Sequence, residues 1–338
     1  MKRAVGWLLA AILAGLAGCQ GMRLRTDVAI DHYVSGRLAM ERQEYELALI
    51  ELSKAIQADP KLSTAHVVMG DIYRKRGDNQ QAAVAYEWAC QTNPYAFRPH
   101  YNLGVTYQLL AGGAKTAEAA AQCIRKAVDT YLRAIAIKPA DPDTLLNLAA
   151  CYYQQGRHDL AEQYCKQAIE ANPKNPFAYS NLGIIYDAQN RLYEAVGAYK
   201  QSLELDTHQP KLILNLGSTY IRLNRLKDAI NAYQLAARED PKSAAPWEQI
   251  GTCHFYQRKL PEAVQAYETG VKLEPRSAAA HRGLGVALMA QHLEDKSRIE
   301  LRDRALDEWN RALELEPNQA DLLQLVRKYT PAASAPAL

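Results

Sequence analysis

Several features that would mark an enzyme are missing from these 338 residues. There is no His-Glu-x-x-His, no Gly-x-Ser-x-Gly and no Walker loop, and the eight histidines are scattered through the chain. Gly283-Leu284-Gly285 lies inside a predicted helix and lacks the preceding strand that a dinucleotide-binding turn requires. The sequence therefore predicts no catalytic residue and no cofactor.

An excess of charge of one sign is also missing. The formal net charge is +3 at pH 7, too small to create a long-range basic field that would gather nucleic acid. We therefore predict a partner other than nucleic acid.

Cysteines are few and lack any paired spacing. None of the six belongs to a Cys-x-x-Cys motif, so the sequence indicates neither a zinc ribbon nor a disulfide framework. Cys151 and Cys165 flank His158 at seven-residue steps, but the repeat described next places both cysteines in the core and the histidine in a turn. We predict small core residues and no metal site; whether Cys151 and Cys165 form a disulfide stays open.

What the chain has in abundance is repetition, mostly with a period of 34 residues. A small residue is followed by an alanine, 12 residues later in six of the eight units and further on in the third and eighth, and the proline slot comes 12 residues after each alanine. The small residues are Gly36, Gly70, Gly104, Ala149, Gly183, Gly217, Gly251 and Gly285. The alanines are Ala48, Ala82, Ala127, Ala161, Ala195, Ala229, Ala263 and Ala305. The prolines are Pro60, Pro94, Pro139, Pro173, Pro241, Pro275 and Pro317, with Thr207 in the remaining slot.

Each position in this pattern has a physical reason. Small residues let two antiparallel helices approach closely, and a proline ends the second helix because it lacks an N–H and disfavours helix in the residue before it. One such unit cannot bury its apolar face alone, whereas stacked units can. The pattern predicts one continuous stack of helical pairs.

The pattern resembles the tetratricopeptide repeat (TPR) family of helix–turn–helix arrays. The resemblance implies an all-α fold, a right-handed TPR superhelix (an α-solenoid) with a C-terminal capping helix at 320–329. About eight units are predicted, at 29–62, 63–96, 97–141, 142–175, 176–209, 210–243, 244–277 and 278–319. A disordered tail at 330–338 is expected to follow.

Two units are longer than the period. In the third, Gly112-Gly113 and a predicted N-cap at Thr116 indicate a helical protrusion. In the eighth, the extra residues around 294–304 are charged and place Glu300 and Arg304 at i,i+4 spacing, which predicts a salt bridge on a solvated helix.

The N-terminus has the features of an export signal. Lys2 and Arg3 precede an apolar stretch that is too short to span a bilayer, and Leu16-Ala17-Gly18-Cys19 follows. This resembles the lipobox of bacterial lipoproteins. The resemblance implies a signal peptide at 1–18, lipid on Cys19 and a short tether at 19–28, with the lipid bilayer as a partner; the alternative is an uncleaved anchor or a chance cysteine. Because Gln20 and not aspartate follows, the resemblance implies a bacterial cell envelope protein in the outer membrane, facing the periplasm.

A groove is the expected binding surface, because the first helices of TPR units line the concave face. Two residues before the small residue, a column of side-chain amides is predicted there: Asn102, Asn147, Asn181, Asn215 and Gln249. A carboxamide both donates and accepts, so the column could pair with the backbone of an extended peptide, and it resembles the asparagine ladder of the O-linked N-acetylglucosamine transferase superhelix. We expect these side chains to be open to solvent; the alternative is that asparagine is common at this slot and holds water or a neighbouring helix. Further groove residues are predicted at Tyr101, Tyr153, Phe177 and Arg222.

The favoured function is a membrane-anchored, non-catalytic scaffold that binds protein or peptide partners. The alternatives are a pilotin-like assembly factor of a type IV or Flp pilus or secretion system, and a targeting subunit of an envelope enzyme. The oligomeric state stays open.

Overall fold

The structure is a computed structural model that describes residues 25–331, and this part of the chain contains helices and no strand. Contacts between helices divide the chain into two compact units, up to Pro173 and from Lys174 onward. The all-α repeat fold that the sequence predicts is confirmed. Each unit is described by itself.

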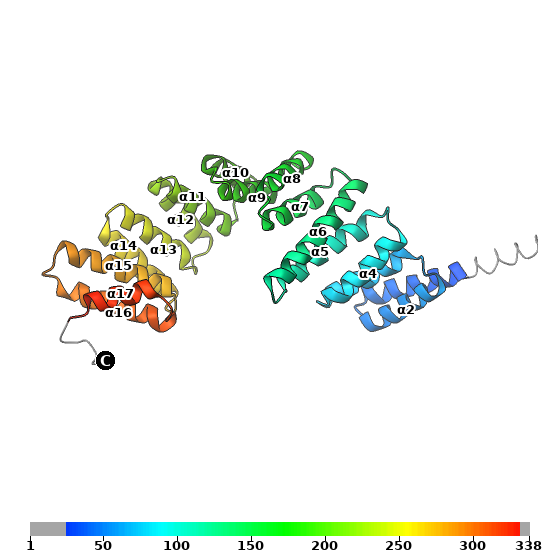
Figure 1. The fold of residues 1–338 in the computed structure, drawn as a ribbon, viewed down its shortest axis with the longest axis horizontal. Helices are drawn as coiled ribbons and strands as arrows, with labels where there is room; N and C mark the ends of the chain where they lie inside the picture. Colours follow the sequence, from blue (N-terminus) through cyan, green and yellow to red (C-terminus); the bar gives the residue numbers. More distant parts are fainter. Residues whose placement is uncertain (1–24, 332–338) are drawn as a thin grey trace, which may run out of the picture. The chain divides into compact units, whose positions relative to one another are not determined.

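The first unit consists of helix pairs that follow one another along the chain (Figure 1). Residues 25–41 are helical and precede α2. The further helices are α2 (Tyr45–Ala58), α3 (Ser63–Lys75), α4 (Asn79–Thr92), α5 (Phe97–Gly112), α6 (Ala117–Ile137), α7 (Pro142–Gln154) and α8 (His158–Ala171).

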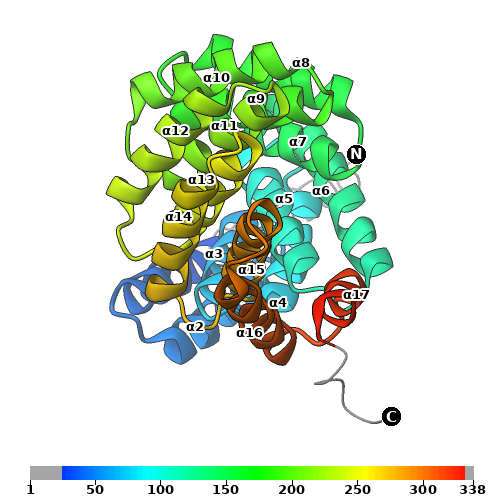
Figure 2. The ribbon, with the colours of Figure 1, turned by 90° about the vertical axis from the view of Figure 1, so that its left-hand side faces the viewer.

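The second unit continues the same alternation and ends in the helix that the sequence predicts as a cap. Its helices are α9 (Pro176–Ala188), α10 (Leu192–Leu205), α11 (Pro210–Arg222), α12 (Leu226–Glu239), α13 (Ala245–Tyr256), α14 (Leu260–Leu273), α15 (Ala278–Glu294), α16 (Ile299–Leu315) and α17 (Ala320–Tyr329). Figure 2 shows α13 to α16 following one another, and α17 packs on α16.

The first helices of neighbouring repeats also contact one another directly. In the first unit α5 contacts α7; in the second, α9 contacts α11 and α13 contacts α15. The first helices therefore form one layer of each unit and the second helices the other. The predicted binding residues lie on the layer of first helices.

The small residue of each first helix lies against a large side chain of the second helix. A Cβ added to Gly183 would lie 2.4 Å from the ring of Tyr199, and one added to Gly217 would lie 2.6 Å from the ring of Tyr233. Both distances are far inside van der Waals contact, so a larger residue would push the helices apart. Equivalent pairs are Gly36 with Leu52, Gly70 with Tyr86, Gly104 with Tyr131, Gly251 with Tyr267 and Gly285 with Trp309.

The fourth repeat fills the same space with a different pair. Ala149 takes the place of the glycine, and Cys165 takes the place of the aromatic residue. Both are buried. The additional methyl group on one helix therefore coincides with a smaller side chain on the other, which keeps the local volume filled.

Second helices end as the sequence predicts, and the one missing proline has a substitute. Where Thr207 stands in the proline slot, the side-chain amide of Gln209 donates to the carbonyl of Ser202 at 3.2 Å and to that of Asp206 at 2.8 Å. The bond to Asp206 satisfies a carbonyl at the end of α10, where carbonyl groups lack a helical partner, and the bond to Ser202 adds to the one that its carbonyl already accepts from the backbone N–H of Asp206.

The long third repeat extends both of its helices. α5 has 16 residues and α6 has 21, and Thr116 accepts a hydrogen bond from the backbone N–H of Ala119, as expected of an N-cap. The predicted helical extension is confirmed.

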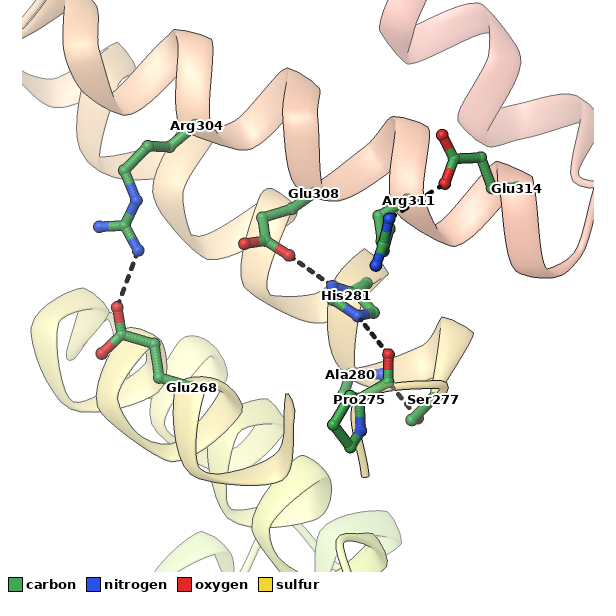
Figure 3. A network of polar contacts seen from close by, with 9 residues as sticks. All are labelled: Glu268, Pro275, Ser277, Ala280, His281, Arg304, Glu308, Arg311 and Glu314. Carbon is green, nitrogen blue, oxygen red and sulfur yellow. Dashed lines mark hydrogen bonds and ion pairs between the residues drawn. The ribbon is translucent and has the colours of Figure 1, made fainter. Parts of the chain in front are cut away.

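The long eighth repeat corrects one prediction. Arg304 does not pair with Glu300; its guanidinium donates to Glu268 on α14 at 2.9 Å (Figure 3). Glu300 lies 3.5 Å from Arg298 instead. The i,i+4 spacing describes neighbours on one helix, whereas the nearer carboxylate for Arg304 belongs to the preceding repeat.

Candidate functional site: the amide column and the cleft beside it

The predicted column of side-chain amides is distributed over the two units. Asn102 on α5 and Asn147 on α7 belong to the first, and Asn181 on α9, Asn215 on α11 and Gln249 on α13 belong to the second. The two groups have different surroundings.

In the first unit, Asn102 is occupied by an internal network. It is buried, and its Nδ2 donates to Oδ1 of Asp71 at 3.1 Å. Asp71, itself buried on α3, also accepts from the hydroxyl of Tyr86 and from the guanidinium of Arg98, each at 2.6 Å. The prediction that the column is open to solvent is therefore wrong for Asn102, because a buried carboxylate on the preceding repeat holds its amide.

The aromatic groove residues of the first unit are half-buried. Tyr101 stacks on Phe97 with ring centroids 5.8 Å apart, and burial together with nearby Asp143 raises the pKa of its hydroxyl. A hydrogen bond with the side chain of Asn147 acts in the opposite direction and lowers the pKa of this hydroxyl. Tyr153 packs on the ring of His158 at 5.4 Å. These rings form part of the packing within their own repeats and leave less surface for a ligand.

In the second unit, the amides have no internal partner. Asn215 is exposed and Asn181 and Gln249 are half-buried, and the side-chain amides of all three lack a hydrogen-bond partner within residues 25–331. Their donors and acceptors are free for water or a ligand.

A cleft of about 390 Å³ lies beside Asn215. It is formed by α9, by the loop that follows α10 and by the start of α11. Phe177 lines it and is 60% exposed although it is a large aromatic residue. The cleft is also lined by Ser180, Ile184, His208, Lys211 and Asn215. The structure thus brings together two predicted site residues, Phe177 and Asn215.

Arg222 is held by the preceding repeat. Its guanidinium donates to the Asp187 carboxylate at 2.6 Å and to the side-chain carbonyl of Asn190 at 2.8 Å. Thr219 donates to the other Asp187 oxygen at 2.9 Å. Arg222 lies at the end of α11, outside the residues that line the cleft, and links two repeats.

Two elements of this surface were not found by sequence reasoning. Asp71 directly follows the small residue Gly70, where the next four repeats carry Val105, Ala150, Ile184 and Ser218. The signal in the sequence that could have revealed the role of Asp71 was a carboxylate at a repeat position where the other repeats carry none. The other is the loop with His208, whose signal was the missing proline at Thr207.

Several predictions concern residues or features outside this surface. Cys19 and the signal peptide lie outside the described residues, as do residues 332–338 of the tail. Among the described cysteines, Cys151 and Cys165 are buried thiols, and burial raises the pKa of each to about 12. Within residues 25–331 no group of His, Cys, Asp and Glu is arranged to hold a metal ion, and none of the helices there combines the length and the apolar character that a membrane span needs.

The helical pairs, their glycine–aromatic contacts and the layer of first helices define a protein of the TPR class. Residues 25–286 match the family described as the Cilia and flagella-associated protein 70 C-terminal domain, and the chain belongs to this family. No curated protein sequence matches the chain.

Solved structures show the same fold at low sequence identity. A tetratricopeptide repeat protein from Parabacteroides merdae ATCC 43184 has a TM-score of 0.54 and 15% identity, over 78% of this chain and 99% of that one. The pilF protein of Pseudomonas aeruginosa has a TM-score of 0.51 and 21% identity, over 64% of this chain and 94% of that one. PilW, described as a widely conserved type IV pilus biogenesis factor, has a TM-score of 0.51 and 21% identity, over 68% and 97%.

Proposed function

We propose that the protein is a non-catalytic scaffold that binds an extended polypeptide segment on its layer of first helices, mainly in the second unit. The observation that carries this proposal is the cleft beside Asn215, where the exposed ring of Phe177 lies next to an amide without an internal partner. A TPR fold is a protein-interaction fold, which fits a polypeptide ligand.

The chemistry of the cleft suits a peptide backbone and one apolar side chain. The carboxamide of Asn215 can accept from a peptide N–H and donate to a peptide carbonyl, whatever the side chains of the ligand. Phe177 and Ile184 offer an apolar surface, and aromatic residues, phenylalanine among them, are enriched at protein interfaces. The lining residues also include one positive charge, on Lys211, and one negative charge, on Asp206.

The proposal includes attachment to a membrane in the bacterial envelope through lipid on Cys19. The support is the sequence Leu16-Ala17-Gly18-Cys19 after an apolar stretch. Several acyl chains, each contributing about 0.8 kcal/mol per buried methylene, would anchor the chain durably. A Cys19→Ala variant should lose metabolic labelling by a fatty acid and remain an uncleaved precursor; normal labelling would exclude the anchor.

A role in pilus assembly is the second candidate, and a targeting subunit of an envelope enzyme remains the third. Support for the second is the similarity in fold to PilW and pilF, both at 21% identity. It is a special case of the scaffold proposal, since it differs in the partner and not in the mode of binding. Loss of surface pili on deletion of the chain, with restoration by the intact chain, would distinguish it.

Photo-crosslinking tests the binding surface directly. A benzoylphenylalanine placed at position 177 should crosslink to unfolded polypeptides offered as ligands. The matched control is the same group at Tyr193 on α10, which is 74% exposed but does not line the cleft. Equal crosslinking at the two positions would show that the cleft has no special role.

A further inference from the structure

A histidine occupies the same slot, four residues before the small residue, in four of the repeats. These residues are His32, His66, His100 and His281. Three residues after the repeat alanine, on the partner helix, the same four repeats carry Glu51, Ala85, Thr130 and Glu308. The four repeats therefore allow a comparison within one chain.

In the first and eighth repeats, the glutamate occupies the space beside the histidine. Nδ1 of His32 lies 2.6 Å from Glu51 Oε2, and Nζ of Lys54 donates to the other oxygen at 2.7 Å. In the eighth repeat, Nδ1 of His281 bonds Glu308 while its Nε2 donates to the carbonyl of Pro275 at 3.1 Å (Figure 3). A carboxylate is thus the partner of the ring Nδ1 in both.

In the third repeat the histidine is present and the carboxylate is missing. His100 is 2% exposed, and its Nε2 donates to the carbonyl of Pro94 at 3.0 Å, as His281 does to Pro275. Its Nδ1 has no hydrogen-bond partner within the described chain. The slot of Glu308 holds the shorter Thr130, and a cavity of about 410 Å³ lies there, lined by His100 and Thr130 among others.

Cations without a carboxylate partner line the same cavity. Arg133 occupies the slot of Lys54, which pairs with Glu51 in the first repeat, and it forms no ion pair among residues 25–331. Lys126 lies over the ring of Tyr107, 5.2 Å from its centroid. Of the two lining carboxylates, Glu87 accepts from the Tyr107 hydroxyl, and Asp129 is exposed.

From this comparison we propose that the cavity between α4, α5 and α6 binds a carboxylate group of a ligand, in the place that Glu51 and Glu308 occupy in their own repeats. The carboxylate accepts from Nδ1 of His100 and pairs with Arg133. Because Nε2 already donates to Pro94, binding requires the doubly protonated, positively charged ring. The carboxylate belongs either to an acidic side chain of a polypeptide or to a free small acid.

The second repeat provides a natural contrast. Its cavity of about 350 Å³ is lined by His66 and Ala85, and no charged side chain lines it. Trp88 stands in the slot of Arg133 and stacks on His66 with centroids 6.2 Å apart. The proposal assigns no carboxylate to this cavity.

The site also predicts a dependence on pH. Burial lowers the pKa of His100 in the free protein, with Arg133 acting in the same direction. The other titratable groups that line the cavity are Glu87 and Cys90 on α4, Tyr107 on α5, and Lys126 and Asp129 on α6. Since the charged ring is the binding form, the carboxylate should bind more tightly as the pH falls toward the pKa of His100, and binding should raise that pKa.

Histidine NMR on the full-length protein tests the proposal, with sodium acetate as the probe and sodium chloride at equal ionic strength as the control. Acetate should shift the resonances of His100, identified from a His100→Gln variant, and leave those of His66 unchanged. Equal responses of His100 and His66, or no response of His100, would overturn the proposal.

A variant that carries its own carboxylate provides the second test. Thr130→Glu should raise the pKa of His100 without any ligand and weaken the acetate response tenfold or more, about 1.4 kcal/mol. Thr130→Gln fills the same space without charge and should leave the pKa low. If Thr130→Glu folds and leaves both quantities unchanged, the assignment of the slot is wrong; if it does not fold, the acetate experiment on the unaltered protein decides.

The source of the carboxylate follows from two further probes. The peptide acetyl-Ala-Ala-Glu-Ala-Ala-amide should compete with acetate, and its glutamine counterpart should not, if an acidic side chain is the natural ligand. Acetate binding without peptide binding would assign the site to free small acids. A glutamine peptide that shifts His100 as strongly as the glutamate peptide would contradict a carboxylate site.

Discussion

In the first unit, Asn102 is buried and donates to Asp71, whereas in the second unit the equivalent Asn215 is exposed and lies beside an open cleft. Both residues stand two positions before the small residue of their repeat. The same slot therefore contributes to internal structure in one unit and is available to a ligand in the other. The difference arises from one neighbour, because Asp71 supplies a buried acceptor that the second unit does not place beside Asn215.

The largest expected effect concerns the first unit, where Asp71 accepts a hydrogen bond from the amide of Asn102. Asp71→Ala should lower the free energy of unfolding by about 2–4 kcal/mol, because it leaves the buried hydroxyl of Tyr86 and the amide of Asn102 without their acceptor. Urea denaturation measures it. In the second unit, Asp187→Ala should cost less than about 1 kcal/mol, since Asp187 and its partner Arg222 are both partly exposed. Equal costs would remove the distinction between the two networks.

The next prediction concerns the packing, which the two units share. Gly104→Val and Gly217→Val should each destabilise the protein by about 1–3 kcal/mol, because the added side chain would meet the ring of Tyr131 or Tyr233. Thermal unfolding followed by circular dichroism checks both. Gly197→Val is the control, since a Cβ at that exposed helical glycine has no neighbour within 4 Å. A tolerated change at Gly217 would contradict the assigned register.

A smaller effect is expected at the turns within the repeats. Gly77 and Gly156 in the first unit have positive φ, and in the second unit Arg258 has φ of 60° at the same place. A non-glycine residue in the left-handed region costs roughly 1–2 kcal/mol, and glycine has its own entropic cost, so Arg258→Gly should stabilise by about 0.5–1 kcal/mol. Differential scanning calorimetry measures it. The reverse change, Gly156→Arg, should destabilise by a similar amount, and a gain from both would contradict this account of the turns.

Much of the fold could be predicted because its rules are local. The spacing of Gly183 and Tyr199 fixes which faces of two adjacent helices meet, and Thr116 caps α6 as its sequence indicates. Contacts between repeats were harder to predict. Arg304 reaches Glu268 on the preceding repeat, and Asn102 reaches Asp71, because side chains of neighbouring repeats choose the nearest partner in space. These pairings depend on distances between side chains of neighbouring repeats, and the spacing of residues along one helix does not determine those distances.

The same reasoning explains the partial prediction of the binding surface. Phe177 was predicted as a groove residue and Asn215 as a member of the amide column, and both line one cleft. Arg222 was predicted as a contact for peptides, but its guanidinium is held by Asp187 and Asn190. A charged residue in a groove can serve either purpose, and its neighbours decide which.

The central claim, that the amides of the second unit bind a polypeptide and that of Asn102 does not, is tested most directly by comparing two variants. Peptides selected on the unaltered protein serve as the ligand, and the dissociation constant and the free energy of unfolding are measured for each variant. Asn181→Ala combined with Asn215→Ala should weaken binding roughly tenfold, since each lost hydrogen bond is worth about 0.5–1.5 kcal/mol, and should leave stability almost unchanged. Asn102→Ala should lower stability by about 1 kcal/mol and leave the affinity unchanged. Unchanged binding in the double variant, or a loss of affinity in Asn102→Ala, would contradict the claim.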